Sequence, residues 1–107
     1  MAAVDWKILA NGQVANAQGT IFTAAEQTWI KSLRLHQTSA TPQDIRVWVK
    51  KAAGTSRKVL HAEDVPQNYS VEVCDQPVTL EAGDTIEAAA TTAAVVDFVV
   101  LGGERVP

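Results

Sequence analysis

Apolar and polar residues alternate with a period of two along most of the chain, which is the pattern of half-buried β-strands. The alternation is clearest over 45–50, and similar short runs recur at 4–8, 19–23, 29–36, 57–62, 69–74, 78–80, 85–91 and 94–101. About eight short strands separated by turn-forming residues are typical of an antiparallel sandwich or barrel. The pattern therefore predicts an all-β, jelly-roll-like β-sandwich that spans residues 1–107 as a single domain.

The residues between the runs predict how the strands connect. Asn11-Gly12 is expected to turn the chain after the first strand, and Gly102-Gly103 to follow the last. We expect the strands over 29–36 and 45–50 to pair as a hairpin across the turn-forming residues 37–43. The alternation assigns one aliphatic face of each strand to the core, with Val47, Val49, Val71, Val73, Ile86 and Val99 as its expected members.

The composition is that of a globular protein. Apolar residues make up 47% of the 107 residues and charged residues 20%, which excludes a chain disordered by composition. No run approaches the roughly 18 consecutive apolar residues that a membrane-spanning helix needs. The first twelve residues also lack the basic start of a secretion signal. We therefore expect no membrane association.

Charge is divided unevenly along the chain, although the net charge is only −3. Residues 27–58 contain seven cations and one anion, whereas residues 59–104 contain nine acidic residues and no lysine or arginine. Either strands from the two segments interleave in space and neutralise one another, or the molecule has a basic and an acidic side suited to ordered packing. Nucleic acid is a weak candidate partner, because the acidic segment would repel it and no basic run is interleaved with aromatics.

No residue pattern indicates catalysis, a cofactor or a metal. His61 lies near Glu63 and Asp64, but a metal site needs at least three converging ligands. Cys74, the only cysteine, excludes an intrachain disulfide and is expected to be a passive thiol on a strand. Asp84 follows Ala82-Gly83 and is expected to shape a turn through its own side chain. We expect a protein that is not an enzyme.

Trp48 is the aromatic residue with the clearest functional interpretation. Alternation directs it away from the aliphatic face, together with Arg46 and Lys50. An outward indole beside cations often marks a contact surface, although the ring could instead pack beneath the aliphatic stems of those cations. The candidate interface consists of Arg46, Trp48, Lys50, Lys51, Arg57 and Lys58.

The other aromatic residues have weaker interpretations. Trp6 and Trp29 are expected to lie in the core or to seal a sheet edge. Trp48 and Tyr69 would also permit a sugar-binding sandwich, but the sequence does not supply the polar half of such a site.

Four stretches, taken in order, form a pattern that spans nearly the whole chain. They are ILANG at 8–12, KSLRLHQTS at 31–39, IRVWVK at 45–50, and LEAGDTI at 80–86 with VDFVV at 96–100. This succession resembles small β-sandwich virion proteins of tailed bacteriophages, which occur as capsid decoration (cement) proteins and as small neck or tail components. The resemblance implies a structural role with no catalytic residues to transfer.

The resemblance therefore implies a non-enzymatic structural protein of a bacteriophage particle. The first hypothesis is a capsid decoration protein that binds the outside of the assembled shell and bridges neighbouring subunits. Its expected partners are the major capsid protein or other virion proteins and further copies of itself, as a homo-oligomer. Its expected location is the virion, after synthesis in the cytoplasm of the bacterial host. Two alternatives stay open: a neck, tail or baseplate component, and a carbohydrate-binding module for host attachment.

Overall fold

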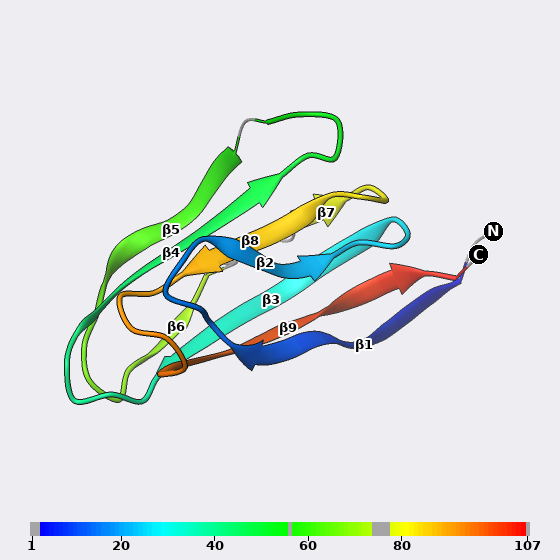
Figure 1. Ribbon diagram of the computed structural model, residues 1–107. Helices are drawn as coiled ribbons and strands as arrows, with labels where there is room; N and C mark the ends of the chain where they lie inside the picture. Colours follow the sequence, from blue (N-terminus) through cyan, green and yellow to red (C-terminus); the bar gives the residue numbers. More distant parts are fainter. Residues whose placement is uncertain (1–2, 56, 74–77, 107) are drawn as a thin grey trace.

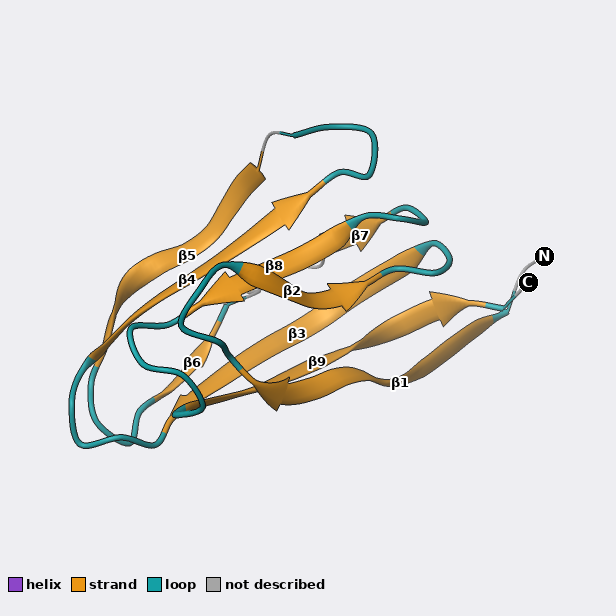
Figure 2. Cartoon of the chain, viewed as in Figure 1, coloured by secondary structure: helices purple, strands orange, loops and turns teal. Residues whose placement is uncertain are grey.

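The structure is a computed structural model that describes residues 3–55, 57–73 and 78–106. These residues form two antiparallel sheets that face each other, so the predicted β-sandwich is confirmed (Figure 1). The described part of the chain consists of strands and loops, as Figure 2 shows. No helix in that part has the length and apolar character to cross a membrane.

Each sheet is assembled from strands that are distant in sequence. Sheet A has the order β1, β9, β3, β6, with β7 also paired to β3; its strands are β1 (Val4–Gln13), β9 (Val96–Arg105), β3 (Thr28–Gln37), β6 (Ser70–Glu72) and β7 (Val78–Leu80). Sheet B has the order β2, β8, β4, β5; its strands are β2 (Gly19–Thr23), β8 (Thr85–Ala89), β4 (Gln43–Lys50) and β5 (Arg57–Val65).

The chain is folded back on itself about its middle. The strand β1 pairs with β9, β2 with β8, β3 with β6 and β7, and β4 with β5, so that early residues lie opposite late ones. Trp6, for example, lies opposite Gly103, and Lys50 lies opposite Arg57 near the β4–β5 hairpin. Two further pairings, β3 with β9 and β4 with β8, complete the sheets in a jelly-roll-like order.

Aliphatic side chains from both sheets fill the space between them. Ile30, Leu33 and Leu35 of β3 are fully buried in sheet A, and Ile45 and Val47 of β4 are fully buried in sheet B. A bulge in the pairing of β3 with β9, between residues 30 and 32, inserts one residue and so returns Leu33 to the inner face. Each sheet therefore supplies one layer of the core, made of the inward side chains that the period-two pattern places on one face of its strands.

Most of the predicted core positions are confirmed. Val47 and Ile86 are fully buried, Val49 is nearly so, and Val71 and Val73 pack against the margin of the core. Val99 is the exception, because it lies opposite Asn11 and Arg34 on the outer face of sheet A.

The error at Val99 has a simple cause. Asp97 is exposed, and a period of two carries Val99 to the same outer face two residues later. The inward positions of β9 are instead Val96, Phe98 and Val100.

The predicted hairpin between β3 and β4 is wrong, because the two strands belong to different sheets. Their connection arches across the sandwich and is held by two fully buried glutamines. Gln37 Nε2 donates to the Thr41 carbonyl over 3.0 Å, and Gln43 Oε1 accepts from the Thr92 N–H over 2.8 Å. A buried amide costs free energy unless it is hydrogen-bonded, and these bonds satisfy both side chains while fixing the arch.

The predicted turn at Asn11-Gly12 is also wrong, as is the predicted end of the last strand before Gly102-Gly103. Asn11-Gly12 continues β1, and Gly102-Gly103 continues β9. A Cβ added to Gly12 would lie 3.4 Å from the Phe98 ring, and one added to Gly102 would lie 2.1 Å from the Trp29 carbonyl oxygen. Gly102 thus makes room for the backbone of β3, whereas Gly12 is required by its φ of +153°, which residues with a side chain rarely adopt.

We expect Val47→Asp to abolish soluble folding. Val47 has no exposed surface, so the new carboxylate would be buried without a partner, at a cost of several kcal/mol against a total stability of about 5–15 kcal/mol. Arg46→Asp is the matched control, because residue 46 points into solvent on the same strand. Soluble yield and circular dichroism measure the outcome; a folded Val47→Asp protein would contradict the core assignment.

Candidate interaction surfaces

Four members of the candidate interface share the outer face of sheet B. Arg46, Trp48 and Lys50 point outward from β4, and Arg57 lies opposite Lys50 on β5. Trp48 is half-buried, with Val59 opposite it on one side and Glu87 on the other. The indole therefore occupies the middle of this face with one exposed side.

Lys51 and Lys58 do not extend this face. Lys51 follows β4, and its Nζ lies 2.9 Å from Asp84 Oδ2. Lys58 lies opposite Val49, so its side chain leaves the edge of the sheet on the inner side. We name the remaining set, Arg46, Trp48, Lys50 and Arg57, the sheet-B face.

Ion pairs bind two cations of the sheet-B face: Arg46 Nε lies 3.4 Å from Asp44 Oδ2, and Arg57 pairs with Glu87. Glu87 is only 8% exposed although it belongs to the outer side of β8. The Arg57 guanidinium donates from Nε to Glu87 Oε1, and Gln18 Nε2 donates to the same oxygen over 3.0 Å. The hydrogen bond from Arg57 lowers the pKa of Glu87 and, with help from Gln18, outweighs the effect of burial. Glu87 therefore stays ionised beneath the arginine.

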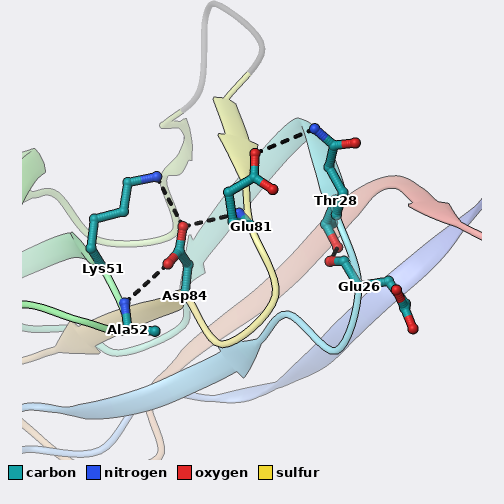
Figure 3. A network of polar contacts seen from close by, with 7 residues as sticks. Glu26, Thr28, Lys51, Ala52, Glu81 and Asp84 are labelled. Carbon is teal, nitrogen blue, oxygen red and sulfur yellow. Dashed lines mark hydrogen bonds and ion pairs between the residues drawn. The ribbon is translucent and has the colours of Figure 1, made fainter.

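Asp84 ties the loop after β4 to the turn before β8, as Figure 3 shows. Its carboxylate accepts hydrogen bonds from Lys51 Nζ at 2.9 Å, from the Ala52 N–H at 3.0 Å and from the Glu81 N–H at 3.0 Å. Burial raises the pKa of Asp84, but these three donors together lower it further, so the net pKa lies below its ordinary value. The predicted turn-shaping role of Asp84 is confirmed.

The described ion pairs favour the first of the two charge arrangements considered above. Lys51 pairs with Asp84, Arg57 with Glu87, and Arg34 with Glu72 at 3.6 Å. Each pair joins a cation of the basic segment to an anion of the acidic segment. The two segments therefore interleave and neutralise one another in these places.

A second surface, on the outer face of sheet A, was not predicted. Trp6 is 61% exposed and Ile8 56%, and both lie beside Leu101 of β9. With Lys7, Lys31 and Gly102 they line an open hollow of about 390 Å³. We name Trp6, Ile8 and Leu101 the sheet-A face. The prediction that Trp6 lies in the core or seals an edge is wrong, whereas Trp29 is half-buried.

A bulge explains why Trp6 points outward. The pairing of β1 with β9 shifts between Ile8 and Ala10, and the apolar residues of β1 that pack against the core, Leu9 and Ala10, lie at and beyond this bulge. Before it, the apolar side chains take the outer face. Gly103 is the sequence signal for this arrangement, because a Cβ there would lie 2.9 Å from the Trp6 ring. The indole thus lies over Gly103 of β9, which has no side chain to displace it.

The remaining candidate residues form no joint site. His61 Nδ1 lies 4.0 Å from Glu63 Oε1, and the residues that the structure describes contain no group of three or more potential ligands able to hold a metal. Tyr69 is exposed next to β6 of sheet A, whereas Trp48 belongs to sheet B, so the two aromatics do not form one platform. Cys74 lies outside the described residues.

Comparison with solved structures finds several similar chains, among them two that are each described as a pentameric capsid protein isolated from metagenomic phage sequences. The first is 22% identical with a TM-score of 0.47, and covers 94% of this chain and 65% of its own. The second is 23% identical with the same TM-score of 0.47, and covers 94% and 63%. This chain thus spans just under two thirds of their length. No protein-family model and no curated protein matches it.

The two buried carboxylates predict a loss of stability in acid. Asp84 and Glu87 have pKa values below their ordinary values of 3.8 and 4.5. Their contribution to the free energy of unfolding is therefore complete at a pH above those ordinary pKa values. It is lost as the pH falls through the lower pKa values of the folded state. We expect the free energy of unfolding, measured by urea titration, to decline below about pH 4.

Variants separate this contribution from general acid unfolding. In the double variant Asp84→Asn with Glu87→Gln, stability should depend less steeply on pH over the acid range than in the wild type. Asp97→Asn, which changes an exposed carboxylate, should keep the wild-type slope. An unchanged slope in the double variant would contradict the assignment.

Proposed function

We propose that this protein is a non-enzymatic structural component of a bacteriophage particle. More specifically, we propose that it is a decoration protein that binds the outside of the assembled shell and bridges neighbouring subunits. The sequence succession at 8–12, 31–39, 45–50, 80–86 and 96–100 supports this role by its resemblance to small virion proteins. The jelly-roll-like order of the strands is compatible with it, since this architecture is common in viral capsid domains.

The observation that carries the bridging role is the presence of an interface-type surface on each outer side of the sandwich. The sheet-A face presents Trp6, and the sheet-B face presents Trp48 with Lys50 on the same side of β4. Tryptophan and arginine are enriched among the residues that dominate binding energy, and charged residues suit the rim of such a contact. A protein that bridges two subunits needs two such surfaces.

The core between the sheets keeps these two surfaces in a fixed relation. Its side chains interdigitate between the sheets, so the outer faces cannot shift independently. A contact on one face therefore positions the other face for a second subunit. A standard interface buries about 1,600 Å² in total, and one such contact on each side would hold neighbouring subunits together.

Copy number in the particle tests this role. Quantitative mass spectrometry of purified particles should count the protein in the hundreds, as expected for a component repeated over the shell. A dozen copies or fewer would contradict the decoration role and favour a neck, tail or baseplate component. Binding to glycans that depends on Trp48 or Tyr69 would instead favour the host-attachment alternative.

Single substitutions on the two faces provide a sharper test. Trp48→Ala and Leu101→Asp each alter one outer face, and each should leave the isolated protein folded while reducing its affinity for particles by about 30-fold, or roughly 2 kcal/mol. Ala53→Asp, in the exposed loop after β4, is the control and should bind normally.

Particle occupancy and melting temperature should be measured side by side for all three variants. If only one face matters for attachment, the protein binds one subunit and does not bridge two. If a face variant unfolds, its side chain stabilises the sandwich itself and the assigned face is wrong.

A further inference from the structure

The free edge of sheet A carries charged residues at Asp5 and Lys7 but neither a proline nor a bulge over Val4–Ile8. β1 is the terminal strand of this sheet and pairs with β9 alone. Residues 4–8 contain no proline, and the bulge of β1 comes only after Ile8. Edge strands usually carry such interruptions because their unpaired N–H and C=O groups otherwise bind another strand. In Figure 1 β1 runs beside β9 toward the chain termini, and none of the described strands pairs with its other edge.

The hydrogen-bonding groups of this edge point away from the sheet at alternate residues. The Val106 N–H donates to the Ala3 carbonyl over 2.9 Å, so Ala3 turns its backbone groups toward the β9 side. Antiparallel pairing alternates from one residue to the next. The backbone groups of Asp5 and Lys7 therefore face β9, and those of Val4, Trp6 and Ile8 face the free edge.

The side chains of the same five residues separate by face. Val4, Trp6 and Ile8 occupy the outer face of sheet A, whereas Asp5 and Lys7 occupy the opposite face. Lys7 Nζ lies 3.3 Å from Asp5 Oδ2, which agrees with their common side. Trp6 is thus flanked by an apolar residue two positions away on each side, Val4 and Ile8. Its immediate neighbours, Asp5 and Lys7, carry opposite charges.

We propose that two copies of this chain pair through β1, antiparallel, with a two-fold axis at Trp6. Trp6 then lies opposite the partner's Trp6, Val4 lies opposite the partner's Ile8, and Asp5 lies opposite the partner's Lys7. Sheet A continues from one copy into the other, and an apolar stripe runs across the junction. Because the contact is isologous, the Val4–Ile8 and Asp5–Lys7 pairings each occur twice, and the Trp6 pairing on the axis occurs once.

Only this register satisfies both the backbone and the charges. An axis at Asp5 or at Lys7 would place like charges opposite each other, and their backbone groups already face β9. An axis at Val4 or at Ile8 would leave Asp5 and Lys7 without charged partners, and the second of these would also include the bulge. Directly opposed charges stabilise an antiparallel pair, and like charges destabilise it.

The position of the Trp6 ring leaves space for the second strand. The ring lies over Gly103, toward β9 and away from the free edge, because that glycine has no Cβ to prevent it. The partner strand can therefore approach the backbone of β1 without displacing the indole. Pairing would also cover part of the hollow at Ile8, and so remove exposed apolar surface from water.

β5 forms an edge of sheet B and has opposite charges at its two ends, but it is a poorer candidate. Its register with β4 shifts between His61 and Val59, so a bulge interrupts the middle of the strand. Arg57, at its basic end, is already bound by Glu87. Over Val4–Ile8 the β1 edge has no bulge. Lys7 contacts Asp5 at 3.3 Å and Glu104 at 3.8 Å, but its side chain is 45% exposed and so accessible to the partner's Asp5.

Site-specific cross-linking tests the register in the isolated full-length chain, with the native thiol removed by Cys74→Ser. Opposed residues in a hydrogen-bonded antiparallel pair have Cα atoms about 5.5 Å apart, within the disulfide range of roughly 4.4–6.8 Å. Trp6→Cys should therefore give a disulfide-linked dimer under mild oxidation. Ile8→Cys is the matched control, because its two copies would lie about 14 Å apart and should not cross-link.

Charge reversal tests the same contact without removing Trp6. Asp5→Lys and Lys7→Asp each place like charges opposite each other, and should raise the dimer dissociation constant about tenfold in sedimentation experiments. The double variant Asp5→Lys with Lys7→Asp restores opposite charges in both pairs and should return the constant to near the wild-type value. Both residues are exposed, so circular dichroism should be unchanged.

Several results would overturn this pairing. They are a wild-type chain that stays monomeric up to about 1 mM, equal cross-linking at residues 6 and 8, no cross-linking at residue 6, or no rescue in the double charge variant. The experiments use the isolated protein and need no phage particle. Their failure would therefore leave the proposed decoration role untouched, and failure of that role would leave the dimer contact untouched.

Discussion

The pairing of each strand from the first half of the chain with one from the second half is the constraint on which the rest of the structure depends. It places the basic segment beside the acidic one, so Arg34 meets Glu72, and Arg57 meets Glu87 across β4. It also brings the two ends of the described chain together along β1 and β9, where Trp6 lies over Gly103. Both outer faces therefore combine residues that are far apart in sequence.

The sequence predicted the parts of the fold that depend on local alternation. The bounds of β2 and β7 and the inward direction of Val47 and Ile86 follow from the period of two. Alternation cannot tell whether two successive strands pair within a sheet or face each other across a core, since both arrangements bury the same side chains. The prediction of a β3–β4 hairpin was wrong for that reason. The two buried glutamines that hold the actual connection between the sheets cannot be told from exposed glutamines in the sequence.

The candidate surfaces were predicted only in part. The outward position of Trp48 followed from the buried neighbours of β4, but the neutralisation of Arg57 depends on Glu87, thirty residues away. The exposure of Trp6 depends on a bulge and on the glycine opposite it, and neither has a local signal in β1. The register between strands that are distant in sequence therefore determines which aromatic residues reach the surface. The sequence of a single strand does not reveal that register.

A sandwich with an interface-type surface on each side is suited to joining subunits, provided that both sides are used at once. Cryo-electron microscopy of particles that contain this protein would test that requirement most directly. We expect density for the sandwich on the outer surface of the shell, with the Trp48 side on one neighbouring protein and the Leu101 side on another. Density confined to the neck or tail, or attached to the shell through one side alone, would contradict it.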